Sequence, residues 1–299
     1  MNNIYTNQGS NVRKTWLLMT AIFVLLIGLG FVFSRVYADP VILYVFAVVA
    51  VFGNVVSYWY SDKLALAVSG AHLLEREQNV RLFRIVENLC ITAGLPQPRL
   101  YLIVSPQINA FATGRNAEHA AIAVTSGALE RLNDNELTGV LAHELSHIGN
   151  RDILVSTVIV VLAGIIAVMA DFFLRFSMWG GGRRSNDREG GGNALFFVLA
   201  IVAAVLAPLA ATLIRLAVSR QREYLADSSG VLLTRYPEGL ASALEKIGQD
   251  EMPMKAAHNA TAHLFISNPF KGERGVSWFT RLYMTHPPIQ ERIRRLRGQ

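Results

Sequence analysis

The sequence predicts a mostly helical α+β protein, in which four hydrophobic segments long enough to cross a membrane interrupt a polar domain. Three observations support this fold class. Hydrophobic residues make up 52% and charged residues 17% of the 299 residues, whereas an ordinary soluble domain has roughly 25% charged residues. Four runs of at least about 18 mainly apolar residues are present. The two polar segments that flank the last two runs are each short for a domain, but together they reach an ordinary domain size.

Composition also limits the function classes. It argues against a disordered chain, a coiled coil and a typical cytosolic enzyme. A net charge of +6 suits an anionic membrane surface as readily as a nucleic acid, so the charge alone selects no partner. Cys90 is the single cysteine, which excludes an internal disulfide and a cysteine-rich zinc site.

The hydrophobic runs divide the chain into five parts. The runs lie at 16–33, 41–60, 153–170 and 194–214. The parts are a polar tail (1–15), a transmembrane hairpin (16–60), a first polar part (61–152), a second hydrophobic hairpin (153–214) and a second polar part (215–299). The first hairpin turns at Asp39 and Pro40, and the second contains a glycine- and arginine-rich loop at 175–193. Because an even number of crossings separates the two polar parts, we expect them on the same side of the membrane.

Basic residues at the ends of the first hairpin orient the chain. Arg13, Lys14 and Lys63 place both polar parts in the cytoplasm by the positive-inside rule. The arginines of the loop at 175–193 would then be on the outer face, which conflicts with the same rule. Either the rule fails here, or the last two runs do not fully cross.

The first polar part contains a predicted helix and two predicted strands. Apolar residues at helical spacing predict a helix over 71–94. Residues 99–104 predict a short strand. Residues 120–124 predict another, because Ile122 and Val124 stand between small residues and Gly127 follows.

A second helix is predicted over 133–149. Asn133 is followed three residues later by Glu136, the spacing of a capping box that opens a helix. Glycine and asparagine at 149 and 150 end the pattern.

This helix contains the sequence HELSH at 143–147. Residues four apart lie on one helix face, so His143 and His147 can offer two imidazole nitrogens to one metal ion. Glu144 lies beside them and could take a proton from a metal-bound water. The pattern is typical of zinc hydrolases, in which zinc lowers the pKa of its water and the carboxylate acts as general base.

A zinc site needs a third protein ligand from elsewhere in the chain. The position six residues after His147 holds Ile153 instead of a histidine. Glu223 follows the fourth hydrophobic run, which a helical hairpin would return to the level of the histidines. Asp227, one turn later, is an alternative ligand, and both carboxylates could instead pair with neighbouring arginines on a solvated helix.

Four separated motifs carry a family resemblance. They are HELSHIGNRD (143–152), SRQREYLAD (219–227), NAFATG (109–114) and THPP (285–288). Together with the hydrophobic runs, these motifs resemble the HtpX-like, membrane-bound zinc metalloproteases over nearly the whole chain. The resemblance implies a gluzincin-type zinc peptidase domain split around a membrane hairpin. It also implies one Zn²⁺ per subunit and a role in quality control of damaged membrane proteins on the cytoplasmic side of the bacterial cytoplasmic membrane.

The resemblance also assigns residues. It implies that Glu223 is the third zinc ligand and that Asp227 orients a ligating histidine. It places Asn109, Ala110, Phe111 and Ala112 near the substrate, and His286 with Arg220 near the oxyanion.

The remaining candidates are given structural roles or alternatives. The histidines that lack a partner at helical spacing are expected on the surface or as helix caps, and they are His72, His119, His258 and His263. A basic tail is expected to contact anionic headgroups and not nucleic acid, and its residues are Arg292, Arg294, Arg295 and Arg297. The partners expected are unfolded or membrane proteins and the lipid bilayer. The alternatives are a CAAX-type prenyl-peptide endopeptidase and a non-catalytic membrane scaffold.

Overall fold

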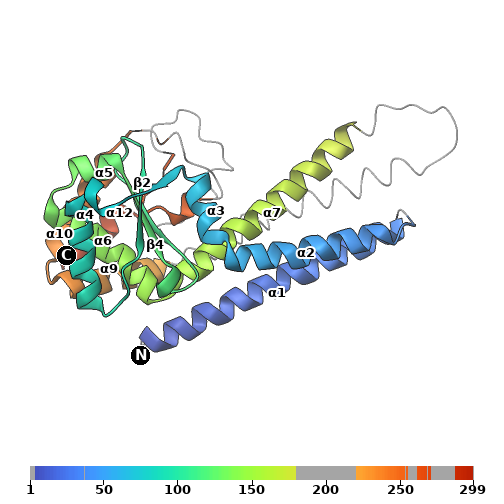
Figure 1. Cartoon of the computed structure of the whole chain (residues 1–299), viewed down its shortest axis with the longest axis horizontal. Helices are drawn as coiled ribbons and strands as arrows, with labels where there is room; N and C mark the ends of the chain where they lie inside the picture. Colours follow the sequence, from blue (N-terminus) through green and yellow to red (C-terminus); the bar gives the residue numbers. More distant parts are fainter. Residues whose placement is uncertain are drawn as a thin grey trace.

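A computed structural model shows a compact domain at one end of the molecule and long helices that project from it (Figure 1). The structure describes residues 4–36, 38–179, 220–252, 254, 261–267, 269–270 and 287–298. The hydrophobic run at 194–214 and most of the loop at 175–193 lie outside the described residues. The predicted fourth hydrophobic helix therefore stays a prediction.

Helices form most of the described chain. The helices are α1 (Ile4–Val36), α2 (Val41–Trp59), α3 (Ser61–Val68), α4 (Val80–Ala93), α5 (Ser126–Arg131), α6 (Asp134–Gly149), α7 (Asp152–Trp179), α9 (Arg220–Thr234), α10 (Pro237–Gln249) and α12 (Ile289–Leu296). The strands are β1 (Ala71–Leu73), β2 (Arg99–Ile103), β3 (Ala110–Thr113) and β4 (Ala121–Thr125). Short 3-10 turns lie at η1 (Arg76–Gln78), η2 (Ala117–His119) and η4 (Ala262–Leu264).

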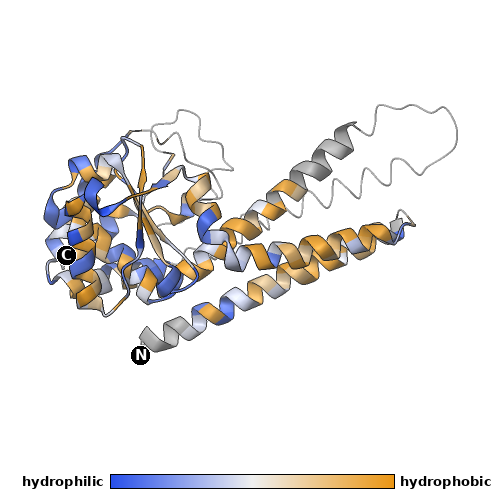
Figure 2. Cartoon of the chain, in the orientation of Figure 1, coloured by the Kyte–Doolittle hydropathy of each residue, from blue (hydrophilic) through white to orange (hydrophobic). Residues whose placement is uncertain are grey.

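The first two helices form the predicted hairpin and are apolar along most of their length (Figure 2). Gly9–Arg35 and Val41–Trp59 are both long and apolar enough to cross a membrane. A third candidate span arises only if α6 and the first part of α7, which meet at 82°, count as one broken span. The described residues therefore support two spans, or up to three, where the sequence predicts four. Helix α1 begins at Ile4, so it includes most of the segment that the sequence predicts to be a polar tail.

The sheet has the strand order β1-β2-β4-β3, with β2 and β4 parallel and the outer pairs antiparallel. Alternate residues of β4 face opposite sides of the sheet. Ile122 and Val124 join the larger core beneath α4, α6 and α10. Ala121 and Ala123 face α3 and residue 160 of α7. The predicted strands at 99–104 and 120–124 are confirmed, whereas β3 falls where the resemblance placed a substrate-binding segment.

The helix predicted over 71–94 is wrong in its first third. Residues 71–73 instead pair with β2 as an edge strand. The helix begins only at residue 80, because the side chain of Asn79 accepts a hydrogen bond from the backbone N–H of Leu82 and caps it. Gly94 ends the helix with a φ of 65°, as its sequence position predicts.

The helix predicted over 133–149 is confirmed as α6. Asn133 and Glu136 form the capping box, with reciprocal side-chain to backbone hydrogen bonds of 3.0 and 2.9 Å. After α6 the chain turns sharply at Arg151, which has a φ of 56°, and continues as α7 toward the projecting helices (Figure 1). Helix α6 thus leads directly into a hydrophobic helix.

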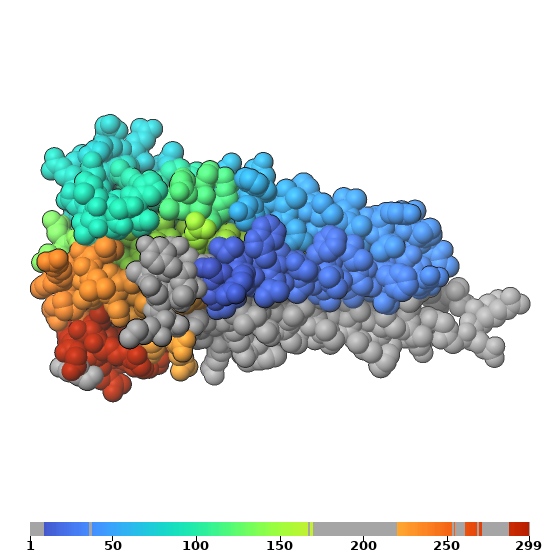
Figure 3. Space-filling view, turned by 90° about the horizontal axis from the view of Figure 1, so that it is seen from below, coloured from blue at the N-terminus to red at the C-terminus, as the bar shows by residue number. Residues whose placement is uncertain are grey.

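The C-terminal helix α12 packs against α10 and α9, where the space-filling view shows the red end of the chain beside the orange segment (Figure 3). Arg297 anchors it through ion pairs with Glu238 and Glu245 at 2.5 and 2.6 Å. Arg295 lies over the ring of Tyr224 at 3.8 Å. The last helix is therefore part of the domain and does not form a free tail.

Candidate active site

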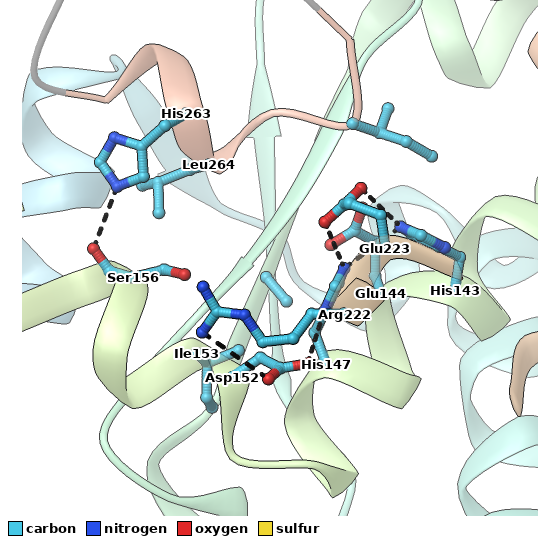
Figure 4. A pocket seen from close by; sticks show the side chains of 12 residues that line it. His143, Glu144, His147, Asp152, Ile153, Ser156, Arg222, Glu223, His263 and Leu264 are labelled. Atoms are coloured by element: carbon cyan, nitrogen blue, oxygen red, sulfur yellow. Dashed lines mark hydrogen bonds and ion pairs between the residues drawn. The ribbon is translucent and has the colours of Figure 1, made fainter. Parts of the chain in front are cut away.

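Helix α6 presents His143, Glu144 and His147 to a small cavity of about 30 Å³ (Figure 4). The Nε2 atoms of the two histidines lie 3.2 Å apart. His143 is fully buried and Glu144 is 2% exposed. The His147 side chain is 15% exposed. Two imidazoles that converge on one point, in a space for about one ion or water molecule, are suited to metal binding.

Helix α9 supplies the third group. Glu223, Asp227 and Gly230 recur at spacings of four and three, so they lie on one face of α9, which packs on α6. A Cβ at Gly230 would lie 3.0 Å from the backbone nitrogen of His143. The glycine thus allows the two helices to approach closely, which brings the carboxylate of Glu223 within 3.6 Å of His147 Nε2 and 3.9 Å of His143 Nε2.

His143, His147 and Glu223 fit a zinc ion. One ligand atom from each lies within 4.8 Å of the other two. Two ligands at about 2.0–2.1 Å from a tetrahedral zinc are ~3.3 Å apart, and the histidine nitrogens are 3.2 Å apart. The set of two imidazoles and one carboxylate is a zinc-hydrolase donor set, and it leaves a fourth position open.

Each histidine has its own carboxylate on the far ring nitrogen. Asp227 Oδ1 lies 2.9 Å from His143 Nδ1, and Asp152 Oδ2 lies 3.0 Å from His147 Nδ1. A carboxylate that accepts the Nδ1 proton leaves the Nε2 lone pair directed at the metal position. The resemblance had placed only Asp227 in such a role, and Asp152 could have been found as the last residue of the HELSHIGNRD motif.

Arg292 holds Asp227 from the C-terminal helix, which corrects the expectation of a basic tail. Its guanidinium is fully buried, and its Nε and one terminal nitrogen donate hydrogen bonds of 2.9 and 2.7 Å to the two oxygens of Asp227. The other terminal nitrogen lies 3.8 Å from Glu223. Burial alone would raise the pKa of Asp227, but Arg292 and His143 outweigh that effect and lower it to about 2.

The environment of Glu144 suits a proton carrier. Burial raises the pKa of its carboxyl, while His143 and His147 act in the opposite direction. The backbone of Ala112 on β3 also hydrogen-bonds this carboxylate. Burial lowers the pKa of His147, but the hydrogen bond that its ring donates to Asp152 and the charge of Glu223 outweigh burial and raise the pKa to about 9.

The other predicted site residues fall in three places. The predicted substrate segment, 109–112, is buried at the start of the edge strand β3, and Ala112 lines the cavity. Arg220 is exposed at the beginning of α9 and does not line the cavity. His286 lies outside the described residues.

His263 and Arg222 line the cavity, although sequence reasoning did not select them. His263 was expected on the surface, but it is 3% exposed, and its Nε2 lies 3.1 Å from the backbone oxygen of Ser156 (Figure 4). Arg222 lies 4.0 Å from Asp152. His72 and His119 are exposed, as expected, and residue 258 lies outside the described residues. The sequence carries no local signal for the position of His263, because that position follows from the packing of η4 against β3.

Comparison with known proteins identifies close relatives over the full length. The profile of peptidase family M48 matches residues 76–299. A protease HtpX homolog from Caldanaerobacter subterraneus is 44% identical over 297 residues, covering 99% of this chain and 97% of the relative. The homologs from Syntrophobacter fumaroxidans and Pyrococcus furiosus are each 47% identical, covering 97% and 95% of this chain and 99% and 94% of their own.

The crystal structure of S. mikatae Ste24p is a more distant likeness. It has a TM-score of 0.49 and 19% sequence identity, and the match covers 95% of this chain. This chain spans 64% of the Ste24p chain.

Proposed function

The chain belongs to peptidase family M48 and is a metalloprotease, and on this premise we propose that it is an integral-membrane zinc endopeptidase. We propose that it cleaves damaged or misassembled membrane proteins on the cytoplasmic side of the cytoplasmic membrane. The observation that carries the proposal is the convergence of His143, His147 and Glu223 in a buried cavity beside Glu144. The family assignment also favours the enzyme over a non-catalytic scaffold.

In the proposed mechanism, His143, His147 and Glu223 hold the zinc. When bound, zinc lowers the pKa of a water molecule and polarises the carbonyl of the scissile peptide bond. The carboxylate of Glu144 accepts the proton of the attacking water and then donates it to the leaving amine. Its raised pKa fits both steps, because a carrier must release the proton as readily as it takes it.

The edge strand β3 is the proposed binding place for the peptide backbone, beyond Ala110, whose carbonyl oxygen already accepts a hydrogen bond from the N–H of Ile266. The outer strand of a sheet can bind an extended peptide through main-chain hydrogen bonds, which tolerate many side chains. The backbone of Ala112 already reaches Glu144 from this strand. A peptide on this edge would therefore lie close to the proton carrier.

The proposal is tested with the detergent-purified full chain and unfolded casein. We expect cleavage by the wild-type protein, loss of cleavage on chelation and recovery with added zinc. Glu144→Gln should retain zinc but lose about 10²- to 10⁴-fold in turnover, the usual contribution of a general base. Glu130→Gln, on the exposed side of α5, is the matched control and should cleave like the wild type. Full turnover by Glu144→Gln would overturn the mechanism.

A further inference from the structure

The polar end of α1 packs against the catalytic domain. One face of this helix contacts the first turns of α7 and carries, in order, Asn11, Thr15, Met19, Ile22 and Leu26. The three apolar residues join α7 in a common core. Asn11 and Thr15 are 3% and 1% exposed, although they belong to the segment that the sequence indicates is a polar tail.

Asn11 reaches the corner between α6 and α7. Its side-chain nitrogen donates one hydrogen bond of 2.7 Å to Oδ1 of Asp152 and another of 3.1 Å to the backbone oxygen of Asn150. Each oxygen of Asp152 thus has its own partner: Oδ1 accepts the hydrogen bond from Asn11, and Oδ2 lies 3.0 Å from His147 Nδ1. A continuous chain of contacts joins the N-terminal membrane helix to a proposed zinc ligand.

The geometry points to a positioning role for Asn11, in which α1 fixes the Asp152 carboxylate and, through it, the orientation and tautomer of His147. A carboxylate 4% exposed needs hydrogen-bond donors on both oxygens, because an unpartnered buried oxygen is costly. Asn11 supplies the donor for Oδ1 and also ties down the α6–α7 corner. The same logic holds on the other side of the site, where Arg292 secures Asp227 and thus His143. Both ends of the chain therefore secure the zinc ligands, and the membrane hairpin is a structural part of the active site.

This inference rests on the zinc site proposed above, and zinc affinity tests it separately from proteolysis. In the full-length detergent-purified protein, we expect Asn11→Ala to bind zinc about tenfold more weakly. This is the lower end of the loss that follows when a residue that hydrogen-bonds to a metal ligand is replaced. Asn11→Asp keeps the shape but sets a carboxylate against Asp152, so it should weaken zinc binding further. Competition with a chromophoric chelator measures the affinity, and kcat and KM for casein are measured in parallel.

Two comparisons separate positioning from simple packing. Thr15→Val is the matched control. Among the described residues, the Thr15 hydroxyl bonds to the backbone oxygen of Asn11 in its own helix, so the zinc affinity of this variant should stay within about twofold of the wild type. In an Asp152→Asn background, Asn11→Ala should have little further effect, since the two residues act in series. The inference is overturned if Asn11→Ala and Asn11→Asp bind zinc like the wild type, if Thr15→Val loses as much as Asn11→Ala, or if the Asn11→Ala loss persists in the Asp152→Asn background. The proposed function is judged separately, by cleavage of casein by the wild type, so any of these results can overturn the role of Asn11 without overturning the proposed function.

Discussion

The buried guanidinium of Arg292 donates two hydrogen bonds, of 2.9 and 2.7 Å, to the buried carboxylate of Asp227. The residues are 65 positions apart in sequence and come from α12 and α9. A fully buried arginine is tolerated only when it is paired and hydrogen-bonded. The contact therefore couples the docking of the last helix to the orientation of His143, which Asp227 bonds on its other side.

A conservative replacement of Arg292 should weaken zinc binding in a protein that remains folded. Arg292→Lys keeps a charge but cannot make two parallel hydrogen bonds to Asp227. We expect zinc affinity to fall about 10- to 100-fold, because His143 loses its fixed partner. Chelator competition measures the effect. Arg294→Lys, exposed on the same helix, should bind zinc like the wild type, and equal affinities for both variants would contradict a role for Arg292.

The close approach of α9 to α6 predicts an unusual response to a glycine substitution. Gly230→Ala should gain helix propensity of about 0.5–1 kcal/mol, yet its Cβ would press against the backbone of His143 at 3.0 Å. We expect α9 to move outward and zinc affinity to fall about tenfold, with little loss in melting temperature. Ser228→Ala, exposed on the same helix, is the control and should change neither quantity. Unchanged zinc affinity in Gly230→Ala would show that α9 and α6 accommodate the added Cβ without moving Glu223.

Local signals were sufficient for some elements but not for others. The capping box at Asn133 and the HELSH pattern each lie within one short segment, so the sequence alone locates α6 and its metal-binding face. Residues 71–73 show the limit, because their apolar residues suit a helix stripe as well as a strand, and only pairing with β2 decides between them. Arg292 could not be identified as buried, since nothing in an arginine-rich segment indicates which member meets a distant carboxylate. The contact between Asn11 and Asp152 spans 141 positions and follows from the packing of α1 on α7.

Thiol labelling can test on which side of the membrane the domain lies. The native Cys90 is buried, and burial raises its pKa to about 11, so it should react slowly with thiol reagents. Asp39→Cys places a reactive thiol in the exposed turn of the hairpin, and Glu130→Cys places one on the domain surface. In intact cells, we expect a membrane-impermeant maleimide to label the Asp39→Cys variant but not the Glu130→Cys variant. The Glu130→Cys variant should be labelled once the membrane is permeabilised. The reverse pattern would place the domain outside.

The segment that leads into β3 gives the protein a predicted acid sensitivity. Asp250 accepts hydrogen bonds from the backbone N–H of Ile108 at 2.6 Å and from Arg131 at 2.9 Å. Burial alone would raise the pKa of its carboxyl, but these bonds outweigh that effect and lower it below its ordinary value of 3.8. A carboxyl whose pKa is lower in the folded state stabilises the protein above its unfolded pKa, and this stabilisation is lost as the pH falls through the folded pKa.

Asp250→Asn should therefore lower the free energy of unfolding by about 1–3 kcal/mol at pH 7, the range for hydrogen bonds to a charged group. The difference from the wild type should begin to shrink once the pH falls below about 4, the ordinary pKa of an aspartate, because the unfolded wild-type chain then takes up a proton that the folded carboxyl resists. Melting temperatures in detergent between pH 7 and pH 3 measure the difference. Asp134→Asn is the control, since that carboxylate is 76% exposed in its ion pair with Arg81 and a surface pair contributes about 0–1 kcal/mol. A gap between wild type and Asp250→Asn that stays constant down to pH 3 would show that the Asp250 carboxylate does not stabilise the entry to β3 through its charge.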